Sequence, residues 1–139
     1  MGMIYAEIEL INAIDLGNAK RNKIGEDEIK RTWVNMLVDT GSMYMCINEH
    51  VREMLELSVI EKRKGVLADG SVVEYEVAGP IEVRFKNRRC VVDAMVLPAG
   101  NEMLLGAIPM EDLDVLIDPN KRELIVHPEH PDMAVMIMK

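Results

Sequence analysis

The sequence predicts an all-β protein, a closed or nearly closed β-barrel with one or two short helices. Three observations lead to this fold class. Short apolar runs rich in Val, Ile and Leu recur along the chain, and several alternate apolar with charged residues. Glycine- and proline-containing turns separate these runs at regular intervals. The dipeptide Asp69-Gly70 stands between two β-prone runs, which is a strong signal for a hairpin.

Length and composition fit one globular domain. The chain has 139 residues, of which 49% are apolar, so it can bury a substantial core. A single Trp and a single Phe leave that core to Val, Ile, Leu and Met. A formal net charge of -8 argues against binding nucleic acid, because the phosphate backbone attracts a basic surface.

Several features of the sequence favour a cytoplasmic protein that does not bind a membrane. The first residues lack the basic segment of a signal peptide, and Ala6 stands where a myristoylation motif needs Ser or Thr. No apolar run is long enough to span a bilayer. Cys46 and Cys90 are too few for a disulfide scaffold or a zinc site. We expect both to be reduced and buried, with a disulfide between them as the alternative.

The expected elements follow one another with polar or turn-forming links. A first strand is predicted over residues 3–16 and a second over 29–38. Residues 17–28 are polar and carry both charges, which predicts a solvated hairpin loop, with a basic recognition patch as the alternative. A short helix is expected after the N-cap Asn48, ending near Leu57. Further on we expect strands at residues 81–85, 90–97 and 103–106, helical turns over 108–113, and a last hairpin at 115–126.

The hairpin around Asp69-Gly70 is predicted from its flanking runs, residues 66–68 and 71–77. Asp-Gly suits a two-residue turn in which both central residues take positive φ. Residues 61–65 are expected to be a charged connection ahead of the hairpin, and Gly79-Pro80 is expected to end its second strand. Taken alone, this pattern describes an ordinary surface hairpin.

The most informative stretch is a buried strand that ends at residue 38 and runs into Asp39-Thr40-Gly41-Ser42. A carboxylate at the end of a buried strand is costly unless hydrogen bonds hold it or it has a chemical task. Thr40 and Ser42 bring hydroxyls nearby, and Gly41 lets the backbone turn tightly. A plain strand-to-loop turn explains the tripeptide equally well when it stands alone.

The order and spacing of these pieces resemble the single-domain, retropepsin-like aspartic protease family, in particular its small prokaryotic members. Asp39-Thr40-Gly41-Ser42 matches the active-site loop, and Ala68-Asp69-Gly70-Ser71 matches the flap hairpin. Leu104-Leu105-Gly106 matches the segment beneath the active-site loop. The resemblance covers about residues 7–127 of a single domain over residues 1–139. The combination is more specific than any one piece.

This resemblance implies an aspartic endopeptidase that acts on a peptide or protein substrate without metal or cofactor. Because the chain has a single Asp-Thr-Gly loop, it implies a homodimer in which each subunit contributes one Asp39 to a dyad around a bridging water. Thr40 then bonds across the two-fold axis, and Ser42 donates to the outer oxygen of Asp39. The hairpin of Ala68, Asp69, Gly70 and Ser71 closes over the substrate. Leu104, Leu105 and Gly106 support the active-site loop.

Other interpretations stay open at this stage. One is a non-catalytic dimeric β-barrel of the same fold that serves binding or assembly, and another is a processing domain that cuts a single partner. The apolar residues 135–138 either pair with their twin in the dimer or complete the sheet of the monomer. His127 and His130 adjoin prolines that prevent a helix from presenting both to a metal, so we expect solvent-exposed histidines. We assign the acids in turns to solvent and helix termini, among them Asp93, Asp112, Asp114 and Asp118.

Overall fold

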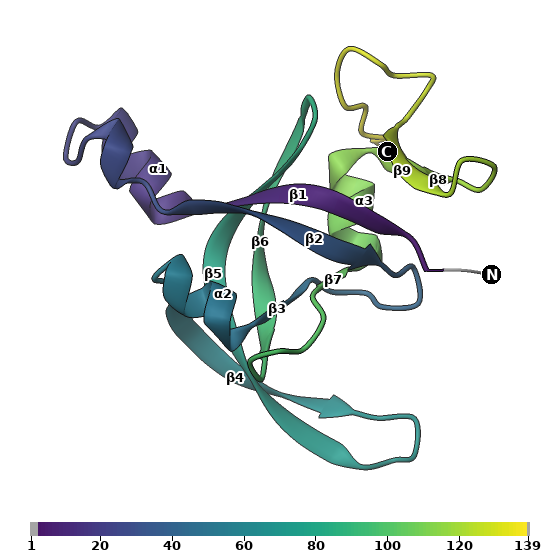
Figure 1. Cartoon of the computed structure of the whole chain (residues 1–139), viewed down its shortest axis with the longest axis horizontal. Coiled ribbons are helices and arrows are strands. Elements are labelled where there is room, and N and C mark those ends of the chain that lie inside the picture. The colour runs from purple at the N-terminus through teal and green to yellow at the C-terminus, as the bar shows by residue number, and fades with distance from the viewer. Residues whose placement is uncertain (1–2, 139) are drawn as a thin grey trace.

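The computed structural model describes residues 3–138, which form mostly β structure with a few short helices (Figure 1). The strands make a seven-stranded sheet and a separate two-stranded sheet. In chain order the elements are β1 (Tyr5–Asn12), α1 (Ala13–Lys20), the 3-10 helix η1 (Glu26–Glu28), β2 (Arg31–Val38), β3 (Cys46–Asn48), α2 (Glu49–Met54), β4 (Ser58–Val66), β5 (Val72–Phe85), β6 (Arg88–Leu97), β7 (Leu104–Leu105), α3 (Ala107–Leu113), β8 (Val115–Asp118) and β9 (Glu123–Val126).

The large sheet has the strand order β1-β2-β7-β3-β6-β5-β4, and β1 also pairs with β5. The pairing therefore leads from β1 through β2, β7, β3, β6 and β5 back to β1, while β4 extends outward from β5. Most of these pairs are antiparallel, but β2 with β7 and β3 with β6 are parallel. The small sheet is the hairpin β8-β9, which was predicted from the sequence.

The core lies on the inner side of these strands. In β1 the side chains of Ala6, Ile8 and Leu10 are buried, while the intervening Tyr5 and Glu7 are exposed, as strand geometry requires. The prediction of an aliphatic and methionine core is confirmed, since the single Trp is 61% exposed. The largest buried apolar side chains include Ile8, Leu10, Ile11, Met36, Met45, Ile47, Leu55, Ile81, Leu105 and Leu113.

The region after β1 differs from the prediction. The strand expected over residues 3–16 ends at Asn12, because this residue caps the helix α1. The side-chain oxygen of Asn12 accepts hydrogen bonds from the N–H groups of Ile14 and Asp15, at 3.0 and 3.1 Å. The expected hairpin loop at residues 17–28 is therefore wrong, since it contains part of α1 and η1. Neither helix buries a side chain, so no apolar pattern marked them.

The hairpin β4-β5 is longer than predicted. Strand β4 includes residues 61–65, which were expected to be a charged connection, and all of its residues except Gly65 are exposed. Strand β5 runs through Gly79-Pro80, which were expected to end it. The register of β5 against β6 shifts between Ala78 and Ile81, so the sheet accommodates both residues as an irregularity.

Two local predictions are confirmed, and one alternative is removed. Asn48 caps α2 by accepting from the N–H of Val51 at 3.0 Å. Cys46 and Cys90 are buried and free, so they form no disulfide with each other. No helix among residues 3–138 combines the length and apolar character needed to cross a bilayer.

The C-terminal segment, residues 127–138, lies outside both sheets. In Figure 1 it loops beside β8 and β9. The alternative in which the apolar end completes the sheet of the monomer is therefore wrong. Five of its apolar side chains are at least 47% exposed, namely Met133, Val135, Met136, Ile137 and Met138.

Candidate active site

Asp39 lies directly after the end of strand β2. Its alternate residues Val34, Met36 and Val38 are buried, and the strand ends directly before the acid. The N–H of Asp39 donates to the carbonyl of Leu105 at 3.0 Å, and the side chain is half-buried. The core therefore fixes the backbone from which the carboxylate projects.

The carboxylate of Asp39 is oriented by its own loop. Its Oδ1 accepts a hydrogen bond from the N–H of Gly41 at 2.9 Å, and the N–H of Ser42 donates to the carbonyl of Asp39 at 3.1 Å. A Cβ at position 41 would lie 3.1 Å from the same Oδ1. Glycine at 41 therefore allows the amide to approach the acid without crowding it.

Ser42 does not make the hydrogen bond expected of it. Its hydroxyl donates to the carbonyl of Tyr44 at 3.3 Å, rather than to the carboxylate of Asp39. The backbone turns after Gly41 in such a way that the hydroxyl faces the next part of the loop. Thr40 is exposed in the turn of the loop.

The segment Leu104–Gly106 lies against this loop. Strand β7 pairs in parallel with the end of β2, with Leu104 opposite Leu37 and Leu105 opposite Val38. The N–H groups of Ala107 and Ile108 donate to the carbonyls of Ser42 and Met43, at 2.8 and 2.9 Å. The start of α3 therefore holds the end of the Asp39 loop through backbone hydrogen bonds.

Gly106 packs tightly against the backbone of residues 42–44. A Cβ at this position would lie 2.3 Å from the carbonyl oxygen of Tyr44 and 2.7 Å from that of Ser42. Backbone atoms cannot move aside as a flexible side chain can. Only glycine therefore fits between α3 and the loop.

The predicted flap residues form the turn of the long hairpin β4-β5, which projects from the body of the molecule (Figure 1). Strand β4 ends at Val66 and β5 begins at Val72, so the loop has five residues rather than two. Within it, the N–H of Leu67 donates to the carbonyl of Ser71 at 2.8 Å. Only Gly70 takes a positive φ, of 84°, which corrects the prediction of two such residues. The amide and hydroxyl of Ser71 both donate to Asp69 Oδ1, at 2.9 and 2.6 Å. The hydroxyl bond is the main reason that the pKa of Asp69 is lowered.

The hairpin β4-β5 is called the hairpin arm below. A cavity of about 560 Å³ lies between this arm, β6 and the start of α3. Val66, Val77 and Val92 contribute apolar walls, while Arg63 and Asp93 contribute charge. Tyr44 and Ile108 also line it, and both adjoin the backbone bonds that hold the active-site loop. No local sequence pattern marked this cavity, because its walls come from five separate segments.

The structure thus brings together two of the three predicted site segments. The Asp39 loop and Leu104–Gly106 share hydrogen bonds, whereas the bonds described for the turn Ala68–Ser71 stay within the hairpin. Tyr44 and Met45, which follow the Asp39 loop, line the cavity together with residues 63–66 of the hairpin arm.

Comparison with known proteins decides the family. Residues 26–108, which include the Asp39 loop and the hairpin arm, match the family model described as aspartyl protease. The chain belongs to the retropepsin-like aspartyl protease family. A search of curated proteins finds no match.

Solved structures of a retroviral protease and of a retroviral protease-like domain share the fold. The crystal structure of the retroviral protease-like domain of Ddi1 from Leishmania major aligns with a TM-score of 0.55 and 15% identity, covering 92% of this chain and 90% of that one. The EIAV protease complexed with the inhibitor HBY-793 aligns with a TM-score of 0.52 and 18% identity, covering 81% of this chain and 88% of that one. At these identities the likeness establishes the fold.

Proposed function

We propose that this aspartyl protease family member is an aspartic endopeptidase that acts as a homodimer. The observation that carries the proposal is the carboxylate of Asp39, presented at the end of a buried strand and oriented by the Gly41 amide at 2.9 Å. One chain holds a single Asp-Thr-Gly loop, whereas the chemistry needs an acid and a base. A two-fold axis beside the loop supplies the second carboxylate from the partner.

The two Asp39 carboxylates of the dimer share one proton. At a separation of about 3 Å and an effective dielectric constant of about 20, two negative charges repel by about 5 kcal/mol. This repulsion keeps one proton on the pair, which titrates as a unit rather than as two separate acids. The pair thus holds a base and an acid side by side.

Peptide hydrolysis then follows from these two forms. The charged carboxylate removes a proton from a water held between the two acids, and the oxygen of this water attacks the carbonyl carbon of the peptide. The protonated carboxylate donates its hydrogen to the developing oxyanion of that carbonyl. When the C–N bond breaks, the proton taken from the water passes to the leaving amine. The hydroxyl formed from the carbonyl oxygen returns its proton to the other carboxylate as the acid product forms, so the dyad is singly protonated again.

The hairpin arm and the cavity are proposed to hold the substrate. The turn of Ala68, Asp69, Gly70 and Ser71 closes over an extended peptide, and the arm offers backbone groups that pair with it. The apolar walls of the cavity, about 560 Å³ in volume, take an apolar side chain of the peptide. The cavity adjoins the active-site loop through Tyr44.

The remaining roles follow from the same arrangement. Thr40 is proposed to bond across the axis to the partner loop, and Leu104, Leu105 and Gly106 hold the loop from beneath. The pairing of β1 with both β2 and β5 supports a closed barrel formed by one domain. Two buried, free cysteines fit a reducing compartment such as the cytoplasm.

Peptide cleavage by wild type and Asp39→Asn tests the proposal. Wild type is expected to cut a peptide library in the acidic to neutral range, and the variant is expected to be inactive while it remains folded. Asp112→Asn serves as the matched control, because Asp112 is an exposed acid on α3 outside the proposed machinery. If wild type and Asp39→Asn behave alike at every pH, the alternative of a non-catalytic dimer that binds or assembles takes its place.

A further inference from the structure

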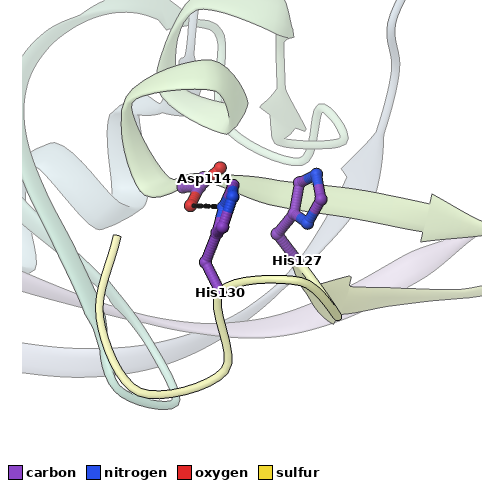
Figure 2. Close-up of side chains that lie close together, drawn as sticks. All are labelled: Asp114, His127 and His130. Atoms are coloured by element: carbon purple, nitrogen blue, oxygen red, sulfur yellow. Dashed lines mark hydrogen bonds and ion pairs between the residues drawn. The ribbon is translucent and has the colours of Figure 1, made fainter. Parts of the chain in front are cut away.

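A second group of polar side chains lies at the base of the C-terminal segment (Figure 2). Asp114 follows α3, while His127 and His130 follow β9. One ligand atom from each of the three lies within 4.8 Å of those of the other two. All three side chains are half-buried, which corrects the prediction that the histidines are solvent-exposed. Asp114 lies at the C-cap of α3, one of the helix termini to which the acids were assigned.

A turn brings the two histidines together where a helix cannot. The N–H of His130 donates to the carbonyl of His127 at 3.0 Å, so residues 127–130 form a turn with Pro128 in its second position. The two imidazole rings stack with their centroids 4.2 Å apart. The prolines exclude a helix, as predicted, but they also shape the turn that places both rings on the same side.

Asp114 supplies a negative charge to this group. Its Oδ2 lies 2.9 Å from His130 Nδ1 and accepts the N–H of Val135 at 2.9 Å. The bond from Val135 is the largest cause of the lowered pKa of Asp114, followed by the bond to His130. A carboxylate oxygen is one of the donors that divalent cations of the zinc class take in proteins.

Arg88 contacts both Asp114 and the backbone of His130. Its guanidinium is fully buried, donates to the carbonyl of His130 and lies 3.6 Å from Asp114 Oδ2. Groups that bind a ligating carboxylate from behind fix its orientation and are a regular part of metal sites. Within residues 3–138, Nε and one terminal nitrogen of Arg88 have no hydrogen-bond partner, so this buried cation is not fully satisfied by the tail alone.

We propose that Asp114, His127 and His130 bind a divalent cation of the zinc class. Two imidazoles and one carboxylate are the donor types that Zn²⁺ takes at tetrahedral sites, with the fourth position open to water. Zinc–nitrogen bonds of about 2.0–2.1 Å place tetrahedral donors about 3.4 Å apart. The donors here lie within 4.8 Å of one another, and binding requires the two histidine side chains to rotate to that spacing.

The bound cation fastens the C-terminal segment to the body of the protein. His127 and His130 belong to that segment, whereas Asp114 belongs to the junction of α3 and β8. In binding, His130 exchanges its hydrogen bond to Asp114 for a bond to the metal, and the carboxylate then binds the metal too. The exposed apolar residues 133–138 follow directly after this anchor point.

Titration of metal-free, full-length protein with Co²⁺ tests the proposal, because tetrahedral Co²⁺ absorbs visible light. We expect saturation at one ion per chain and displacement by Zn²⁺. His127→Ala and His130→Ala should each weaken binding by about tenfold or more. His50→Ala is the matched control, since His50 is the third histidine of the chain and lies exposed on α2, and it should bind as wild type does.

A measurement on wild type alone covers the case in which a variant fails to fold. The imidazole proton resonances of His127 and His130 should shift when Zn²⁺ is added, while those of His50 stay unchanged. Cleavage after Glu129 by a glutamate-specific protease should also slow. Non-saturating absorbance, equal shifts of all three histidines, or binding that survives loss of both tail histidines would overturn the site.

Discussion

Two carboxylates lie where a secondary-structure element ends, and their surroundings differ. Asp39 follows β2, and within residues 3–138 its carboxylate accepts one hydrogen bond, from the amide of Gly41 in its own loop. Asp114 follows α3, and its Oδ2 alone meets His130, the amide of Val135 and the buried Arg88. A carboxylate that accepts few hydrogen bonds retains lone pairs for a water or substrate. A carboxylate surrounded by cations and donors instead joins parts of the chain.

The largest difference between the two sites is expected in catalysis. Asp39→Asn should reduce kcat by at least about 10³-fold, because an amide cannot act as base or acid in the dyad. The Asn oxygen can still accept the Gly41 amide, so the denaturation midpoint should stay close to that of wild type. Steady-state kinetics and chemical denaturation of the same preparation measure both quantities. A folded variant with substantial activity would contradict the role of Asp39.

The converse substitution, Asp114→Asn, should affect stability more than chemistry. It removes the carboxylate beside Arg88, whose side chain is fully buried, and an unpaired buried cation is costly. Asn suits the left-handed backbone at this position, where φ is 55°, so the loss reports on charge rather than on strain. Denaturation midpoints should fall below those of Asp39→Asn, while kcat changes little. The reverse ranking would remove the distinction between the two acids.

Gly106→Ala tests how rigidly the active-site loop is held. A methyl group there would meet the carbonyl oxygen of Tyr44 at 2.3 Å, so the loop or α3 must shift. We expect a loss of about 2 kcal/mol in the free energy of unfolding, as for other overpacked sites, together with reduced kcat. Gly17→Ala is the control, because a Cβ at this helical position meets nothing within 4 Å and should stabilise by about 0.5 kcal/mol. Equal stability of the two variants would contradict the described contact.

The loss of stability at acidic pH should also depend on Asp114. The pKa of Asp114 is lowered in the folded state, so this residue contributes stability above its unfolded pKa of about 3.9. That contribution is lost as the pH falls through the lower folded pKa. Wild type should therefore lose more stability below about pH 4 than Asp114→Asn does. Denaturation curves between about pH 2 and pH 5 measure this, and parallel curves for the two proteins would exclude the contribution.

The smallest effect is expected from Ser42→Ala. The hydroxyl donates to the carbonyl of Tyr44 at 3.3 Å, which is a long bond in an exposed loop. We expect kcat/KM to change by less than about threefold and the acidic limb of the pH–rate profile to stay in place. A shifted acidic limb would instead indicate that the hydroxyl reaches Asp39 in the working enzyme.

The parts of the fold that the sequence predicted are those with local signals. Asn48 before α2 is a capping residue, and the apolar run before Asp39 marks a buried strand. Helix α1 buries no side chain, and the side chains of β4 are almost all exposed. Neither element carries the apolar periodicity on which the prediction depends. Their conformation comes from Asn12 as a cap and from the pairing of β4 with β5.

The sites divide in the same way. The Asp39 loop and Leu104–Gly106 are contiguous motifs, so their positions could be predicted from residue types. The cavity and the group around Asp114 each join segments that are distant in sequence, and the hydroxyl direction of Ser42 depends on the backbone of the loop. No local pattern encodes such distances, because the pairing of β strands sets them.

Subunit mixing tests whether the dyad is shared, since activity should then require one Asp39 from each of two chains. Wild type is mixed with Asp39→Asn at constant total protein, and cleavage is measured after the subunits have exchanged. If dimers form at random, an equal mixture should retain about a quarter of the wild-type rate, because only that share of dimers carries two carboxylates. A rate of about one half, proportional to the wild-type chains present, would show that each chain acts alone and would contradict the shared dyad.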